Sequence, residues 1–139
     1  MKTYEFKHNT PTLEEYKYLC DSVGWTYYIN FDVANISLKN SIHCITVKDD
    51  EQIIGMGRIV GDGSIYFYIQ DIVVHPNYQK HGIGKEIMHR LVSYLHENAP
   101  DKAFVGLFAS EGKKSFYEKF DFKDYSPNMT GMFTVISRT

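Results

Sequence analysis

The sequence predicts an α/β (α+β) fold in which helices flank a mixed, mostly antiparallel sheet. Runs of β-branched and aromatic residues, separated by short turn signals, follow one another over residues 41–74. A long segment with the apolar period of a helix comes next, at residues 82–97. A further apolar run follows this helix. Because a strand reached through a helix can lie parallel to the strand before it, the sheet is expected to be mixed.

The N-terminal part predicts one short strand and two helices. The strand is expected over Lys2–Lys7, where aromatic residues alternate with polar ones. Thr12 and Glu15 have the spacing of a capping box, which predicts a helix from there to about Val23. A second, shorter helix is expected over residues 31–39.

The remaining elements alternate between strands and helices. An Asp-Gly hairpin signal joins two of the central strands. The long helix over 82–97 is expected to end before Pro100, since proline cannot continue it. The expected strands are Ser41–Lys48, Gln52–Val60, Ile65–Val74, Ala103–Phe108 and Gly131–Ser137, and Glu111–Phe120 is expected to be a short helix.

A glycine-containing loop, Gln79-Lys80-His81-Gly82-Ile83-Gly84, lies between the strand ending at Val74 and the long helix. The first turn of a helix leaves backbone N–H groups without partners and carries partial positive charge. The two glycines lack a Cβ, so an anion can approach the backbone closely. Lys80, His81 and Lys85 add positive side chains. This stretch therefore predicts a phosphate or diphosphate site, although a simple strand-to-helix turn is the alternative.

Two known phosphate-binding motifs do not fit this loop. The nucleotide P-loop requires Ser or Thr after Gly84-Lys85, where this chain has Glu86, and a glycine where it has Gln79. The dinucleotide fingerprint requires a third glycine, and position 87 is isoleucine. A dehydrogenase-like nucleotide binder is therefore disfavoured.

Three segments together resemble the GNAT superfamily of N-acetyltransferases. Gln79–Gly84 is similar to its Q/R-x-x-G-x-G/A signature, and Asp71–Pro76 resembles its acetyl-CoA strand. Phe116–Phe122 is similar to its FYxKxGF segment, with Asp121 in place of the usual glycine. Aspartate tolerates a left-handed backbone better than most residues, so the turn is still expected there. The three matches come in the family's order and span about residues 41–137.

The resemblance implies a GNAT-like sheet of six to seven strands with about four helices and a splayed parallel strand pair at its centre. It implies an acetyl-CoA-dependent N-acetyltransferase, in which a primary amine attacks the thioester directly in a ternary complex. A weaker similarity, in the pattern of Leu107–Ala109, Phe116-Tyr117 and Gly131–Phe133, points to the branch that includes plant aralkylamine acetyltransferases. A non-catalytic CoA-binding or sensing domain on the same fold is the alternative function, because fold does not fix function.

The resemblance also assigns the acetyl-CoA site. The pantetheine arm is expected to pair with the backbone of Ile72–Val74 like an added strand. An N–H near Val73 or Val74 would then stabilise the oxyanion. The residues implied for acetyl-CoA binding are Ile72, Val73, Val74, Gln79, Lys80, His81, Gly82, Ile83, Gly84 and Lys85.

Tyr117 matches the family's general-acid tyrosine. A phenol with a pKa of ~10 is protonated at neutral pH, so it could donate a proton to the sulfur of the leaving thiolate. The alternative is a core tyrosine on an aromatic helix face. Tyr68 and Gln70 stand where relatives carry Glu or His, and neither is a base at pH 7, so a water chain through them or an amine arriving deprotonated is the hypothesis. Strand alternation puts Ile72 on their face and Asp71 on the other, where Asp71 is expected to make a structural hydrogen bond.

The acceptor is expected to be a small-molecule amine or a protein amino group. In GNAT-like proteins the region between the first two helices closes over the acceptor. Trp25, Tyr27 and Tyr28 lie there and are candidate walls of the acceptor site. Ordinary core packing against the sheet is the alternative for each of them.

Composition and charge limit the other partners. The 139 residues are expected to form one domain, 1–139, and a net charge of −2 gives no reason to expect nucleic acid. No apolar run is long enough to span a bilayer and no signal peptide is evident, so no membrane and a cytoplasmic location are expected. Cys20 and Cys44 are expected to be reduced core thiols. The six histidines form no H-x-x-x-H, so no metal is expected. The resemblance allows a homodimer, since family members are often dimers.

Overall fold

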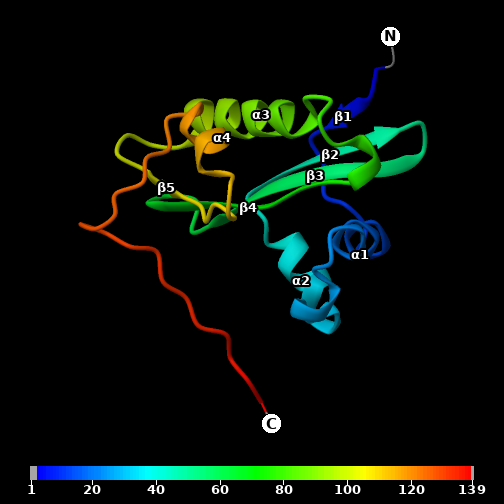
Figure 1. The fold of residues 1–139 in the computed structure, drawn as a ribbon, viewed down its shortest axis with the longest axis horizontal. Coiled ribbons are helices and arrows are strands. Elements are labelled where there is room, and N and C mark those ends of the chain that lie inside the picture. Colours follow the sequence, from blue (N-terminus) through cyan, green and yellow to red (C-terminus); the bar gives the residue numbers. More distant parts are fainter. Residues whose placement is uncertain (1–2, 139) are drawn as a thin grey trace. The chain divides into compact units, whose positions relative to one another are not determined.

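The computed structural model describes residues 3–138, and the chain divides into two compact units (Figure 1). The first unit extends to Leu107 and holds the sheet and three of the described α-helices. The second begins at Phe108 and holds the short helix α4, Lys114–Glu118. Each unit is described by itself.

The sheet of the first unit has five strands in the order β1-β2-β3-β4-β5. The first three pairings are antiparallel, and β4 and β5 are parallel. This confirms the prediction of a mixed, mostly antiparallel sheet. The strands are β1 Glu5–Lys7, β2 His43–Asp49, β3 Gln52–Gly61, β4 Tyr66–Val74 and β5 Phe104–Gly106.

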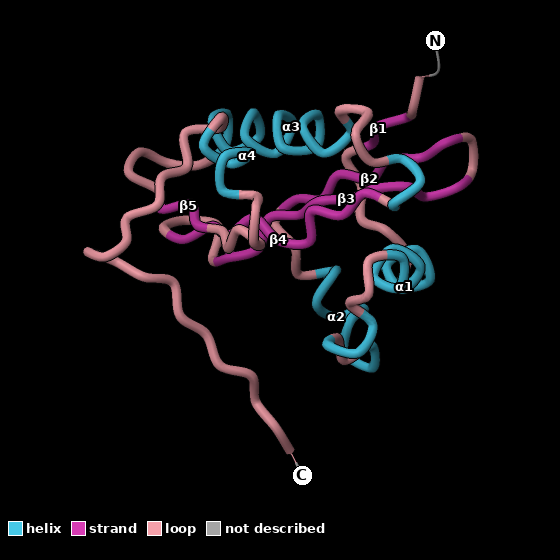
Figure 2. The backbone as a smooth tube through the Cα atoms, in the orientation of Figure 1, coloured by secondary structure: helices cyan, strands magenta, loops and turns pink. Residues whose placement is uncertain are grey.

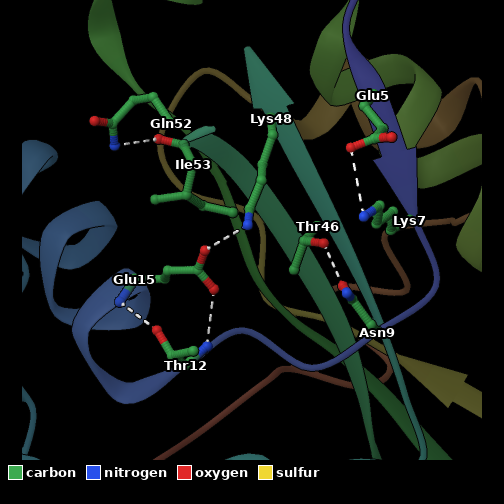
Figure 3. A network of polar contacts seen from close by, with 9 residues as sticks. All are labelled: Glu5, Lys7, Asn9, Thr12, Glu15, Thr46, Lys48, Gln52 and Ile53. Atoms are coloured by element: carbon green, nitrogen blue, oxygen red, sulfur yellow. Dashed lines mark hydrogen bonds and ion pairs between the residues drawn. The ribbon is translucent and has the colours of Figure 1, made fainter. Parts of the chain in front are cut away.

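The predicted capping box begins the first helix, α1, Leu13–Ser22. The Glu15 N–H donates to Thr12 Oγ1 at 3.1 Å, and the Thr12 N–H donates to Glu15 Oε1 at 2.9 Å (Figure 3). Lys48 Nζ lies 3.1 Å from Glu15 Oε2, which ties this helix to β2. The second helix, α2, spans Ala34–Lys39 after a 3-10 turn, close to the predicted range. The long helix, α3, spans Ile83–Asn98.

The helices cover the two faces of the sheet, with α3 on one face and α1 and α2 on the other (Figure 1). On the α3 face β3 is unusually close to the helix. A Cβ added to Gly57 would lie 2.6 Å from both Ile72 Cδ1 and Ile87 Cγ2. On the other face a buried cluster joins α1 and α2 to the sheet. Its members are Tyr16, Leu19, Cys20, Ala34, Leu38, Ile53, Met56 and Val73.

The prediction of six to seven strands is wrong: the described residues form five. Gly131–Ser137 is drawn as loop in Figure 2 and pairs with no strand among the described residues. Its Met132 and Phe133 are 85% and 81% exposed. Strand propensity mainly reflects packing against neighbouring strands, and this segment has none. The parallel pair is also not central, since β5 is at the edge of the described sheet.

Other predictions agree more closely. Asp121 adopts the expected left-handed conformation, with φ of 70°. Of the predicted first strand, Lys2 lies outside the described residues. Cys20 and Cys44 are free and buried, as predicted, and burial raises the pKa of the Cys20 thiol to about 11. Within residues 3–138, no helix combines the length and apolar character needed to cross a membrane.

We predict that Thr12→Ala lowers the free energy of unfolding by about 1 kcal/mol, because it removes the hydroxyl that accepts from the Glu15 N–H. Urea denaturation followed by circular dichroism measures the change. Thr10→Ala, in the exposed loop before the helix, is the matched control. Equal losses in the two variants would contradict a capping role for Thr12.

Candidate functional site

A β-bulge interrupts β4 at Asp71. Met56 pairs with Val73, and Arg58 pairs with Gln70, so two residues of β4 stand opposite Gly57. Asp71 has a φ of 55°, which is unusual for a residue other than glycine. A bulge of this kind shifts the alternation of side chains along the strand.

This bulge overturns part of the predicted arrangement of side chains on β4. Gln70 is paired with Arg58 and shares its face, the one covered by α1 and α2. Asp71 contacts Tyr16 of α1 and therefore lies on this face too, not on the opposite one. Ile72 faces α3, because its Cδ1 lies beside the Ile87 side chain at Gly57. The predicted grouping of Tyr68 and Gln70 is compatible with the register, but Ile72 does not join them.

Asp71 makes the structural hydrogen bonds predicted for it. Its Oδ2 accepts from Arg58 Nε at 2.8 Å and from the Tyr16 hydroxyl at 3.1 Å. Burial and the nearby Asp71 carboxylate raise the pKa of the Tyr16 phenol, so this group keeps its proton and donates. The sequence reasoning missed Arg58 and Tyr16. A lone arginine within an apolar strand, next to a strand carrying one aspartate, was the available signal.

One edge of β4 lacks a paired strand over its second half. β5 is paired only with Tyr66–Tyr68, and in the described sheet no strand lies beside Ile72–Val74 on that edge. The His75 N–H donates to the Ile54 carbonyl of β3 at 2.8 Å. Because successive backbone groups point to opposite edges, the N–H groups of Val74 and Ile72 point away from β3. The open edge therefore carries two outward N–H groups.

The glycine loop follows directly. A 3-10 turn, Pro76–Tyr78, leads into it, and the Tyr78 hydroxyl donates to Asp49 Oδ2 at 2.8 Å. Lys80 and Gly82 have left-handed backbones, with φ of 67° and 81°. The Gln79 side-chain amide donates to the Val74 carbonyl at 2.9 Å, which ties the loop back to β4.

Gly82 is the N-cap of α3, and its carbonyl accepts the first helical bond, from Glu86 at 3.0 Å. In the part of the chain that is described, no hydrogen-bond acceptor is recorded for the amide N–H groups of residues 80–85. A Cβ at Gly82 would meet nothing within 4 Å, so there is open space above the backbone. The side chains of Lys80, His81 and Lys85 are exposed, whereas Ile83 is buried in the core. An anionic group fits these amides and cations.

The aromatic candidates between α1 and α2 differ from one another. Trp25 packs against the buried cluster on the α1 face, which favours the core alternative for this residue. Tyr27 and Tyr28 are 93% and 79% exposed and contact each other edge to face, with centroids 5.7 Å apart. Core packing therefore does not explain these two tyrosines.

Tyr117 lies on α4 of the second unit. Its ring is half-buried and contacts Phe116 edge to face, with centroids 5.1 Å apart. Burial raises the pKa of its phenol. At neutral pH this side chain is therefore a proton donor rather than an acceptor of protons.

Comparison with known proteins identifies the family of this chain. Residues 21–132 match the family model described as the acetyltransferase (GNAT) domain. The chain belongs to the GNAT acetyltransferase family. It is therefore an acyltransferase, as the sequence motifs predicted.

Three known proteins illustrate what this GNAT acetyltransferase is similar to. The uncharacterized N-acetyltransferase ycf52 of Pyropia yezoensis is 35% identical, over 87% of this chain and 70% of its own length. A probable acetyltransferase from meticillin-resistant Staphylococcus aureus has a crystal structure with a TM-score of 0.89. It is 30% identical, and the match covers 96% of this chain and 100% of that one. The histone acetyltransferase TAP1 of Glycine max is 28% identical, over 83% of this chain and 53% of its own length.

We predict that Gly82→Ala in this acetyltransferase lowers the free energy of unfolding by about 1–2 kcal/mol. The cause is strain in a left-handed backbone rather than a clash, since a Cβ there meets no atom within 4 Å. Gly82→Asn is the control, because asparagine tolerates this conformation better. Urea denaturation compares the two. An asparagine variant that loses as much stability as the alanine variant would contradict this explanation.

Proposed function

We propose that this GNAT acetyltransferase moves the acetyl group of acetyl-CoA to a primary amine, on a small molecule or a protein, by direct attack on the thioester in a ternary complex. One observation carries the proposal. The open edge of β4, with its outward N–H groups, runs directly into the amides of residues 80–85. An extended arm that carries amides and ends in a diphosphate matches that sequence of groups, and acetyl-CoA has such an arm.

The chain's own residues divide the binding of acetyl-CoA between them. The backbone of Ile72–Val74 pairs with the arm, and residues 79–85 hold the diphosphate. Of the two N–H groups predicted for the oxyanion, the Val74 N–H is favoured, because it points to the open edge. A donor held in place before the reaction stabilises developing negative charge without reorganisation. Bound acetyl-CoA supplies the activated acyl group and a thiolate leaving group.

Proton transfers are assigned to side chains as follows. Tyr117 donates a proton to the departing thiolate, which its raised pKa supports, because the phenol keeps its proton through neutral pH. Tyr68 and Gln70 are not bases at pH 7. They instead hold water that accepts the proton of the amine, or the amine arrives neutral.

The acceptor site is proposed between α1 and α2, beside Trp25, Tyr27 and Tyr28. Two exposed aromatic rings support an amine acceptor, because a protonated amine is attracted to the face of a ring. The relative named as a histone acetyltransferase supports a protein amino group among the acceptors to be tried.

We predict that acetyl-CoA raises the melting temperature of the protein and that an amine in a panel releases CoA thiol in its presence. The panel contains arylalkylamines, polyamines and a lysine peptide. A ligand that binds only the folded state stabilises it by mass action, by ~2.7 kcal/mol at 100 times its dissociation constant. No shift at such an excess would overturn the donor assignment, whereas a shift without turnover would overturn only the acceptor class.

We predict that Tyr117→Phe lowers kcat about 100-fold or more while the dissociation constant for CoA changes little, because the proton donor is lost and the ring is kept. Since burial raises the pKa of Tyr117, the wild-type rate should fall through loss of this proton only above about pH 10. Tyr125→Phe, an exposed tyrosine of the same unit, is the control. An unchanged kcat in Tyr117→Phe would remove this residue from the mechanism.

A homodimer and a cytoplasmic location stay predictions. The exposed apolar side chains of the C-terminal segment, Met132, Phe133, Val135 and Ile136, support association with another chain. Light scattering of the purified protein measures the oligomeric state.

A further inference from the structure

A largely buried ion pair, with the hydrogen bonds that its two side chains make, joins four elements of the first unit. Arg58 on β3 and Asp71 on β4 lie 2.8 Å apart, and their side chains are only 9% and 13% exposed. The Tyr16 hydroxyl of α1 donates to the same Asp71 oxygen at 3.1 Å. The rest of the Arg58 guanidinium donates to the Ser37 carbonyl of α2 at 3.1 Å and to the Ser37 hydroxyl at 3.1 Å. It also donates to the Ser41 hydroxyl at 3.0 Å.

This ion pair lies between the proposed acetyl-CoA site and the proposed acceptor site. On one side is the bulge at Asp71, which sets the direction of the Ile72 and Val74 N–H groups. On the other side is α2, which closes the connection that carries Tyr27 and Tyr28. The Arg58 fork therefore connects the strand that would hold the thioester to the segment that would hold the amine.

Stability alone is a poor explanation for this arrangement. Burying two charges carries a large desolvation cost, and well-packed apolar residues of similar volume often serve the fold equally well. Asp71 also keeps a left-handed backbone, which is unfavourable for a residue with a Cβ. Strained backbone conformations that are held in place by surrounding contacts, as Asp71 is by its ion pair, are found most often at active sites and binding sites.

We infer that Arg58 and Asp71 are positioning residues for acetyl transfer: their ion pair holds the β4 bulge, and so aims the open-edge N–H groups, while it fixes α2 against the same strand. The inference rests on the proposed function for what the bulge positions. Neither residue takes part in the chemistry, and the pair acts through the backbone of Ile72–Val74.

The test uses the double variant Arg58→Met/Asp71→Asn, which removes both charges, leaves no unpaired ion in the core and keeps at position 71 a residue type that tolerates a left-handed backbone. Lys48→Met is the matched control, since it removes another ion pair between the sheet and α1, away from the bulge. Arg58→Lys keeps a positive charge next to Asp71, but lysine cannot reproduce the hydrogen bonds of the guanidinium to Ser37 and Ser41. Each variant is measured by melting temperature, CoA affinity, acetyl-transfer kinetics and amide hydrogen exchange.

The double variant is expected to stay folded, with kcat lowered about tenfold or more and the acceptor KM raised, because small displacements at a reacting site are costly. CoA affinity should fall less than kcat, since residues 79–85 are untouched and only the pairing of the arm with Ile72–Val74 is loosened. Amide exchange over residues 70–74 should rise about tenfold, reflecting local opening of the bulge. The kcat and the exchange rates of Arg58→Lys should lie between those of the wild type and of the double variant. Lys48→Met should match the wild type in kcat and in exchange over 70–74.

A folded double variant with wild-type kcat and wild-type exchange over 70–74 overturns the inference, as does an equal fall in kcat in Lys48→Met. If the double variant does not fold, Tyr16→Phe decides, because it removes one hydrogen bond to Asp71 and leaves the ion pair intact. It should raise exchange over 70–74 and lower kcat, and wild-type values in both overturn the inference. Hydrogen exchange is read without substrate. If the wild type acetylates no amine, the proposed function fails, while the exchange result still decides whether the pair holds the bulge.

Discussion

The bulge at Asp71, held by Arg58, is the constraint on which the arrangement of β4 depends. One extra residue opposite Gly57 changes which side chains face each layer beyond that point. It puts Gln70 and Asp71 together on the face of α1 and α2, and it directs Ile72 toward α3. At the bulge, β4 therefore presents the polar side chains of Gln70 and Asp71 to α1 and α2, and the apolar side chain of Ile72 to α3.

The donor and the acceptor are proposed to bind to different parts of the molecule. The groups proposed to hold acetyl-CoA are mostly backbone amides of β4 and of the first turn of α3, and any residue can supply an amide. A fold can keep such a site while its side chains diverge, which agrees with a TM-score of 0.89 at 30% identity to the Staphylococcus aureus protein. The acceptor is proposed to meet side chains between α1 and α2, where a single substitution changes the chemistry presented.

Local patterns predicted much of the fold and of the glycine loop that is proposed to bind the diphosphate. The capping box, the short helix near residue 34, α3 and the left-handed Asp121 all agree with the structure. The strand predicted at Gly131–Ser137 does not form, because a strand needs a partner and the pattern of one segment cannot supply it. The predicted face of Ile72 is wrong because alternation assumes an uninterrupted strand, and no residue type marks a bulge at Asp71 as clearly as a glycine would.

The sequence by itself determined the features that depend on neighbours within a few residues. The Thr12–Glu15 box, the end of β4 in a glycine loop and the amides at the start of α3 are of this kind, since their hydrogen bonds or geometry are local. Only the tertiary structure decided the position of the bulge and the role of Arg58. Asp71 meets an arginine 13 positions away in sequence and a tyrosine 55 positions away, and both contacts exist only once the strands and α1 have packed.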